Sequence, residues 1–283
     1  MHFDYTTVGH VTIDVLADGS RRPGGTAFYS ALQAARLGQR ARVLTRGVAH
    51  EIEQLVEPYR GEFELEIRAA ERTTTLHTVG RGSGRLQRML AWAGPVGEDL
   101  AVDTSILHLA PVARETPRRW RGQVSFVGLT PQGLARQWSA KGGEISLAPF
   151  SAAAGAPLAR SCDALVMSEH ERSSCAELIS TAREAGAVIA VTAGAAPSKI
   201  LLPDGGVLEL PVPPVANSGD DLGAGDVFAA AFFVSLAAGD PAERAAAFAN
   251  AAAAVRMQGV GAGAIGDRAA IEARLHAGAH PSA

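Results

Sequence analysis

Lysine is scarce in this sequence: only Lys141 and Lys199 occur, so arginine supplies nearly all of the positive charge. Neither lysine follows a glycine-rich turn and no G-x-x-x-x-G-K-[ST] segment is present, which excludes a P-loop kinase. The spacing G-x-G-x-x-G is also missing after the first expected strand, which excludes a Rossmann dinucleotide site. The two cysteines and eight histidines lack the spacing of structural zinc ligands, and so few cysteines indicate a reducing, cytoplasmic setting.

Long apolar runs are lacking too. The longest, Val227 to Ala238, spans about a dozen residues, whereas a membrane-spanning helix needs about 20. The first residues show no basic segment followed by an apolar one, so we expect no signal peptide. The net charge of −3 gives no bias toward nucleic acid. We therefore expect no membrane or nucleic-acid partner, and we interpret one short basic cluster as a solvated loop: Arg114, Arg118, Arg119 and Arg121.

Strand-like and helix-like patterns alternate from about residue 5 to residue 260. This alternation predicts an α/β fold with a mostly parallel sheet covered on both faces, and ligands near the carboxyl ends of its strands. The expected strands are Thr6–Val11, Ala41–Thr45, Ile106–Ala110, Val124–Gly128, Glu144–Ala148, Ala164–Met167 and Val188–Thr192. The expected helices are Gly24–Leu37, Gln132–Ser139, Ser173–Ala185, Gly225–Ala238 and Pro241–Met257.

One segment interrupts the alternation. Phe63–Arg68, Thr74–Gly80 and Leu86–Trp92 are strand-like with no helix between them, and a glycine-rich turn joins the last two. This pattern predicts either a small β-flap over the sheet or an edge meander. We expect a single domain over residues 1–275, with a flap contributed by about residues 63–93 and a tail at 276–283.

The stretch Asn217 to Phe228 contains the most informative motif, Gly223-Ala224-Gly225-Asp226 before a long apolar helix. Free backbone N–H groups at the start of that helix form a nest that binds phosphate oxygens. An aspartate at this place is either a helix cap or a base that takes a proton from an acceptor hydroxyl. Phosphoryl transfer needs little more than such a base and an anion hole, and we expect the helix dipole to keep Asp226 ionised.

These motifs resemble signatures of the ribokinase-like (PfkB) carbohydrate kinases. The segment Asp220 to Asp226 is similar to their C-terminal signature, D-T-T-G-A-G-D, and Gly24-Gly25 to their N-terminal signature. Asp14 matches the acid that holds two substrate hydroxyls in that family. The resemblance implies a three-layer α/β/α fold and transfer of the γ-phosphate of ATP to a sugar or polyol, with Asp226 as base and Gly223, Ala224 and Gly225 as anion hole.

The resemblance also implies a set of residues that bind ATP and Mg²⁺. Glu171 matches the acid of the family motif N-x-x-E and would reach Mg²⁺ through water, although Ser168 replaces the asparagine. Thr192 and Gly194 match a T-x-G turn beside the nucleotide, and Asn250 a position in the adenine pocket. The nucleotide-side residues are therefore Ser168, Glu171, Thr192, Gly194, Asp220 and Asn250.

The sequence departs from the family pattern at Tyr29, where asparagine is usual, and at Asp221 and Leu222, where Thr or Ser is usual. The segment from Gly128 to Arg136 resembles G-x-x-P-Q-G-x-x-R of a branch that includes plant myo-inositol kinases. The resemblance thus implies an inositol-like acceptor, bound by Asp14, Gly24, Gly25, Tyr29 and Arg136. Other possibilities stay open: a nucleoside or other small-alcohol kinase, a non-catalytic sugar or nucleotide sensor, another phosphoryl donor, and a homodimer paired through the flap.

Overall fold

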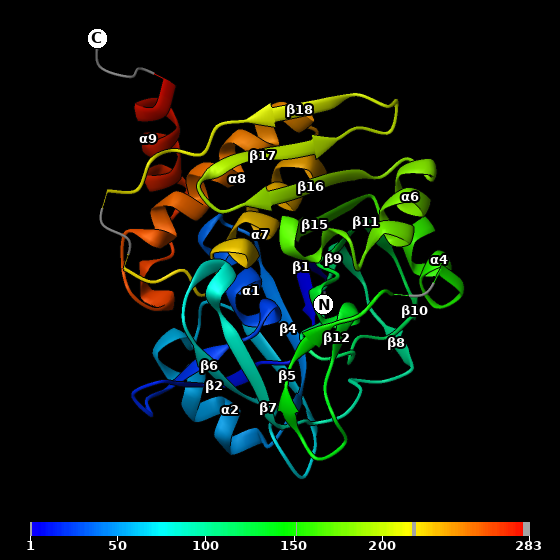
Figure 1. The fold of residues 1–283 in the computed structure, drawn as a ribbon, viewed down its shortest axis with the longest axis vertical. Coiled ribbons are helices and arrows are strands. Elements are labelled where there is room, and N and C mark those ends of the chain that lie inside the picture. Colours follow the sequence, from blue (N-terminus) through cyan, green and yellow to red (C-terminus); the bar gives the residue numbers. More distant parts are fainter. Residues whose placement is uncertain (1, 151, 217–218, 280–283) are drawn as a thin grey trace.

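A nine-stranded sheet forms the centre of the protein (Figure 1). The computed structural model describes residues 2–150, 152–216 and 219–279. Seven strands run parallel, in the order β16-β15-β11-β9-β1-β4-β5, and the hairpin β17-β18 adds two antiparallel strands at the β16 edge. The strands are β1 (Phe3–Val8), β4 (Ala41–Gly47), β5 (Glu64–Ala69), β9 (Thr104–Leu109), β11 (Val124–Leu129), β15 (Ala164–Ser168), β16 (Val188–Ala193), β17 (Ala196–Leu201) and β18 (Val207–Leu210).

Helices cover both faces of this sheet, which confirms the predicted α/β class. Helices α1, α7 and α8 pack together over one face and share a large apolar core, in which Phe28, Phe228 and Phe232 are fully buried. Helices α4 and α6 pack over the other face around a second core that includes Leu107, Leu165 and Ile189. The helices are α1 (Thr26–Arg36), α2 (Ala49–Val56), α3 (Gln132–Ala135), α4 (Ala152–Arg160), α5 (Glu169–Arg172), α6 (Ala176–Glu184), α7 (Ala224–Ala237), α8 (Ala242–Met257) and α9 (Arg268–Ala279).

A separate five-stranded sheet forms the flap, in the order β13-β7-β6-β2-β3. The assignment of Phe63–Arg68 to the flap is wrong: β5 pairs in parallel with β4 and closes the edge of the main sheet. The hairpin β6-β7 instead pairs with β2, which directly follows the first strand of the main sheet. The strands of the flap are β2 (Thr12–Leu16), β3 (Arg21–Gly24), β6 (Thr75–Val79), β7 (Leu86–Ala91) and β13 (Gly143–Glu144).

Three other expected elements differ from the structure. The helix expected at Gln132–Ser139 ends at Ala135, because Arg136 and Gln137 are extended and pair with β14 as β12. The strand expected at Glu144–Ala148 is divided between two small sheets, after Gly142 and Gly143 turn the chain with positive φ. Arg119 and Arg121 of the basic cluster, which we expected in a loop, lie in β10, and this strand pairs in parallel with β8. These short strands are β8 (Asp99–Ala101), β10 (Arg119–Arg121), β12 (Arg136–Gln137) and β14 (Ser146–Leu147).

The expected tail begins within a helix, since α9 continues to Ala279; residues 280–283 lie outside the described residues. Among the helices described, none combines the length and the apolar character that crossing a bilayer requires. On the flap, the outer face of β7 exposes Leu86 and Leu90, with Trp92 beyond its end. A homodimer paired through the flap stays a prediction.

Candidate active site

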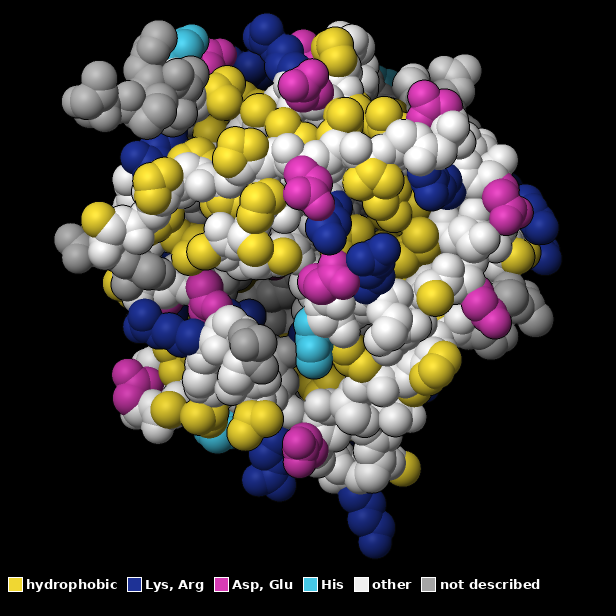
Figure 2. Space-filling view, turned by 45° about the horizontal axis from the view of Figure 1, so that its top comes forward, with side chains coloured by type: hydrophobic (Ala, Val, Ile, Leu, Met, Phe, Trp, Pro, Cys, Tyr) yellow, Lys and Arg dark blue, Asp and Glu magenta, His cyan; other side chains and the backbone are white. Residues whose placement is uncertain are grey.

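A cavity of about 580 Å³ lies between the flap and the carboxyl ends of the central strands. Figure 2 shows a hollow on this face, with acidic, basic and histidine side chains around it. Strands β15 and β16 end at the cavity, and helices α1 and α7 begin there. This is the place where parallel α/β sheets bind ligands, because loops and helix N-termini converge at that edge.

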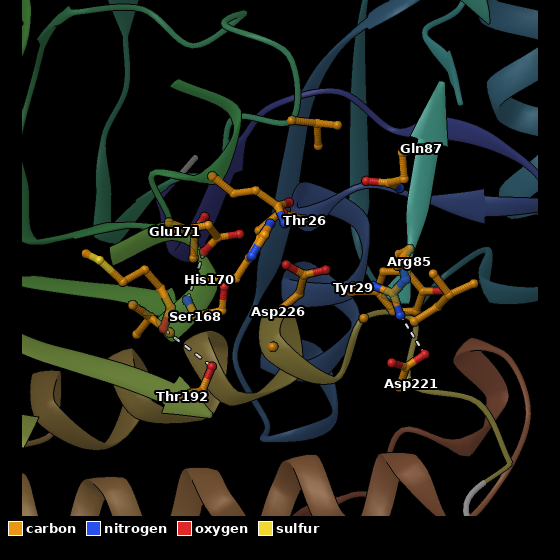
Figure 3. Close-up of a pocket in the computed structure, with 18 of the residues that line it drawn as sticks. Thr26, Tyr29, Arg85, Gln87, Ser168, His170, Glu171, Thr192, Asp221 and Asp226 are labelled. Carbon is orange, nitrogen blue, oxygen red and sulfur yellow. Dashed lines mark hydrogen bonds and ion pairs between the residues drawn. The ribbon is translucent and has the colours of Figure 1, made fainter. Parts of the chain in front are cut away.

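The Asp226 side chain lies in the middle of this cavity (Figure 3). It stands in the first turn of α7, whose N-cap is Gly223, so Asp226 is not the cap of its own helix. The expectation that the helix dipole keeps Asp226 ionised stays a prediction, and burial acts against it. Burial dominates and raises the pKa of Asp226 to about 6, although the Thr26 hydroxyl and the nearby Arg136 charge oppose the increase. The carboxylate is therefore a stronger base than an exposed aspartate.

The backbone before α7 forms the expected anion nest, with one correction. Gly223 has φ 78°, and a Cβ there would lie 2.3 Å from the Tyr29 ring, so only glycine fits. The N–H of Ala224 donates to the Asp221 carbonyl oxygen at 3.3 Å, so it closes the turn and is not free for a ligand. Within the described chain, the N–H groups of Gly225 and Asp226 have no protein acceptor and remain available to an anion.

Asp220 does not face the cavity, although the sequence places it on the nucleotide side. Its carboxylate accepts hydrogen bonds from the Arg256 guanidinium and, at 2.8 Å, from the Gly261 N–H. Arg256 is fully buried and also donates to the Leu222 carbonyl at 2.6 Å. This ion pair holds the loop that shapes the nest, so Asp220 acts on the fold of the loop and not on a ligand.

Asp14, which we expect to contact the substrate, lines the cavity from the flap strand β2. Its Oδ1 accepts a hydrogen bond from the Thr12 hydroxyl at 2.8 Å. Burial raises the pKa of Asp14 to about 6, while the charges of Arg136 and Arg85 oppose the increase. Gly24 packs against this carboxylate, because a Cβ there would lie 2.3 Å from Oδ2. Gly25 lines the cavity beside them with φ 90°.

On the side of Asp226 away from Arg85 and Gln87 lie residues expected at the donor, Ser168, Glu171 and Thr192 (Figure 3). Glu171 and Ser168 form a capping box at α5, in which one Glu171 oxygen accepts the Ser168 N–H at 2.8 Å. Thr192 and Gly194 line the cavity at the end of β16. Asn250 does not: its amide donates to Ser198, Leu210 and Pro211 and ties α8 to the β17-β18 hairpin.

Arg136 lies in the cavity, but not on a helix as expected. Its guanidinium is buried and donates to the Val112 carbonyl at 3.1 Å and to the Gln87 amide oxygen at 2.5 Å. Burial lowers the pKa of Arg136, and the nearby carboxylates oppose this decrease. Tyr29 closes the cavity behind the nest, with its ring against Gly223.

Sequence reasoning missed Thr26, Arg85 and Gln87, which line the cavity as well. Thr26 directly follows the Gly24-Gly25 pair, so its position near the site could have been inferred from the motif. Arg85 and Gln87 come from the flap hairpin, and no local pattern marks them as site residues. Among the described residues, no group of three or more histidine, cysteine or acidic side chains is arranged to hold a metal ion.

Comparisons with known proteins find similarity to one family. The family described as pfkB family carbohydrate kinase matches residues 150–268, a segment that contains Glu171 and Asp226. No curated protein matches the chain in sequence.

Solved structures match nearly the whole chain. A pyrophosphate-dependent kinase of the ribokinase family, complexed with a pyrophosphate analog and myo-inositol, is 22% identical, with a TM-score of 0.73 over 91% of this chain and 96% of that one. Arabidopsis thaliana ribokinase, complexed with ribose and ATP, is 19% identical, with a TM-score of 0.74 over 97% and 99%. Methanocaldococcus jannaschii nucleoside kinase is 18% identical, with a TM-score of 0.71 over 96% and 98%. The resemblance to the pfkB carbohydrate kinases is thus confirmed, and the chain has the ribokinase fold.

Proposed function

We propose that this chain is a kinase that transfers a phosphoryl group to a hydroxyl of a sugar or polyol. One observation carries the proposal: the Asp226 carboxylate, the start of α7 with the free N–H groups of Gly225 and Asp226, and the acceptor-side Asp14 line one cavity. A base, an anion nest and a hydroxyl-binding acid in one cavity match the needs of phosphoryl transfer.

The proposed reaction begins with the acceptor hydroxyl between Asp14 and Asp226. The acceptor oxygen forms a bond to the transferred phosphorus, and the bond from that phosphorus to the leaving phosphate breaks. Asp226 takes the hydroxyl proton, and the Gly225 and Asp226 N–H groups stabilise the negative charge on the phosphate oxygens. With a pKa of about 6, Asp226 is largely ionised at pH 7.5 and can accept this proton.

The proposed donor is ATP with Mg²⁺, on the nucleotide side formed by Ser168, Glu171, Thr192 and Gly194. When bound with the donor, Mg²⁺ neutralises phosphate charge; donor oxygens and water would hold it, with Glu171 reaching it through water. One oxygen of Glu171 serves the capping box, which fits a water-mediated contact better than a direct one. Pyrophosphate is a second candidate donor, because a similar structure is of a pyrophosphate-dependent kinase and Asn250 is occupied by protein partners.

An inositol-like polyol is the proposed acceptor. The supporting observations are the segment from Gly128 to Arg136 and the similarity in fold to a kinase complexed with myo-inositol. Arg136 and Gln87 add polar donors and acceptors on the flap side of the cavity, where a polyol has hydroxyls to bind.

The test is turnover of Mg-ATP and of Mg-pyrophosphate against a panel of polyols, pentoses, hexoses and nucleosides. Release of ADP or of inorganic phosphate is followed, with Asp226→Asn as the control. Turnover that is lost in the control supports the kinase and names its donor and acceptor class. If neither donor is consumed but calorimetry shows that one still binds, the non-catalytic sensor replaces the kinase.

A further inference from the structure

The carboxylate of Asp221 joins the tip of the flap to the loop before the nest. Asp221 Oδ1 accepts from Arg85 Nη2 at 2.5 Å, and Asp221 Oδ2 accepts from the Gly82 N–H at 2.7 Å. Both partners belong to the turn between β6 and β7, whereas Asp221 lies two residues before Gly223. Figure 3 shows the Arg85–Asp221 contact at one side of the cavity.

The position of Asp221 poses an electrostatic problem. A fixed negative charge so close to an anion nest repels the phosphate that the nest binds, and the kinase signature has an uncharged Thr or Ser at this place. The Arg85 guanidinium neutralises that charge at direct contact. Both side chains are mostly shielded from solvent, with 24% of the Arg85 and 20% of the Asp221 side chain exposed, so bulk water screens the pair only partly.

Arg85 also has a hydrogen-bond donor that is available to a ligand. It lines the cavity, and its charge opposes the increase in pKa of both Asp14 and Asp226, so its field reaches the acceptor acid and the base. Its Nε is buried and has no hydrogen-bond partner among the described residues. A buried donor without a partner costs free energy, and a phosphate oxygen would relieve that cost.

We propose that Arg85 is a phosphate-binding residue carried by the flap, and that Asp221 positions it beside the nest. This inference rests on the proposed kinase function. Closing of the flap brings Gly82 and Arg85 onto Asp221, so the Arg85 guanidinium joins the site only when the flap covers the cavity. The guanidinium then contacts the transferred phosphoryl group from the flap side, opposite the N–H groups of α7. An open flap lacks this cation, which couples phosphoryl transfer to exclusion of water.

The first test compares steady-state kinetics of Arg85→Ala, Arg85→Lys and Asp221→Asn with those of the parent chain. Arg88→Ala is the matched control, because Arg88 is an exposed arginine on β7, the strand that directly follows Arg85. We expect Arg85→Ala to lower kcat/KM for the donor about 100-fold or more, as expected for loss of a preorganised group at the developing charge. Arg85→Lys restores only part of this loss, because lysine lacks the planar fork. Arg88→Ala stays within about twofold of the parent.

A second test reads the position of the flap without activity. Trypsin cleaves after Arg81 and Arg85, on either side of the turn. We expect Asp221→Asn to speed cleavage after Arg81 about 10-fold, because cleavage follows the population of the open flap. We also expect pyrophosphate to bind the parent chain in calorimetry and to bind Arg85→Ala at least 10-fold more weakly.

The two tests separate the possible failures. Equal cleavage rates of Asp221→Asn and the parent would refute the positioning role of Asp221. Equal pyrophosphate affinity and equal kcat/KM in Arg85→Ala and the parent would refute phosphate binding by Arg85. If the parent chain turns over neither donor, the kinase function fails, yet the cleavage rates and the pyrophosphate affinities still decide on Asp221 and Arg85.

Discussion

Replacing Asp226 with asparagine tests the site through stability as well as through activity. Burial raises the pKa of Asp226 from 3.8 to about 6 in the folded chain, so the folded state holds its proton more tightly than the unfolded state does. The ionised carboxylate is therefore a destabilising group in the folded protein at neutral pH. The full difference of about 2 pKa units corresponds to about 3 kcal/mol. Because the side chain remains partly exposed in the cavity, we expect about 1–2 kcal/mol.

The sign of the effect fixes its pH dependence. The destabilisation is complete above the folded pKa of about 6 and disappears as the pH falls toward the unfolded value of 3.8. Asp226→Asn lacks this charge at every pH, so the variant is expected to melt about 2–6 °C above the parent at pH 8. Near pH 5 the difference shrinks by about half, because the parent carboxyl is then largely protonated.

The assay pairs calorimetric melting at pH 5 and pH 8 with turnover at the same pH values. We expect Asp226→Asn to lose about 100-fold or more in kcat, since an amide does not take the acceptor proton. The parent is expected to lose activity as the pH falls through about 6. A variant that keeps more than about a tenth of the parent rate would refute the base assignment. A melting difference that is the same at both pH values would refute the burial argument.

Three further substitutions test the acceptor side, the nest and a buried carboxylate of the fold. Asp14→Ala is expected to raise the acceptor KM with little effect on the donor KM; an unchanged acceptor KM would remove Asp14 from the acceptor site. Gly223→Ala, at φ 78° and against the Tyr29 ring, is expected to lower the free energy of unfolding by about 1–3 kcal/mol in urea titrations, and equal midpoints would contradict the required close approach. Glu115→Gln leaves buried N–H donors of His10, Val112 and Ala113 with one fewer strong acceptor and is expected to cost about 1–3 kcal/mol, with unchanged stability as the contrary result.

The main sheet could be predicted because its signals are local. Strands such as Val124–Leu129 and Ala164–Ser168 are short apolar runs bounded by turns, and their parallel arrangement follows from the helices between them. The flap could not be assembled in the same way. Glu64–Ala69 and Thr75–Val79 look alike in sequence, yet one pairs with β4 and the other with β2. That choice depends on contacts between segments far apart in the chain, which no local pattern encodes.

The same distinction holds for the site. Asp226 and Gly223 belong to one continuous motif, so their chemistry could be inferred together. Asp220 belongs to that motif too, but its partner Arg256 is 36 residues away and takes up its carboxylate. The Asn250 amide likewise donates its hydrogen bonds within the protein, to the Ser198 hydroxyl and the Leu210 carbonyl. A polar side chain serves a ligand or the fold according to what lies opposite it, and only the tertiary structure supplies that partner.

The buried charges of the cavity destabilise the folded state, so packing elsewhere in the protein must compensate for them. Burial disfavours the ionised forms of Asp14, Asp226 and Arg136 alike, so none of the three stabilises the fold when it is charged. Arg136 donates to a carbonyl and an amide, which are neutral acceptors. The apolar packing of α1, α7 and α8 must therefore offset the cost. Under the proposed function, a phosphate donor and a polyol would supply the partners that these groups lack, because phosphate oxygens pair with the arginines and hydroxyls with the carboxylates. The electrostatic cost of burying these charges would then favour binding of a phosphate donor together with a hydroxyl-bearing acceptor.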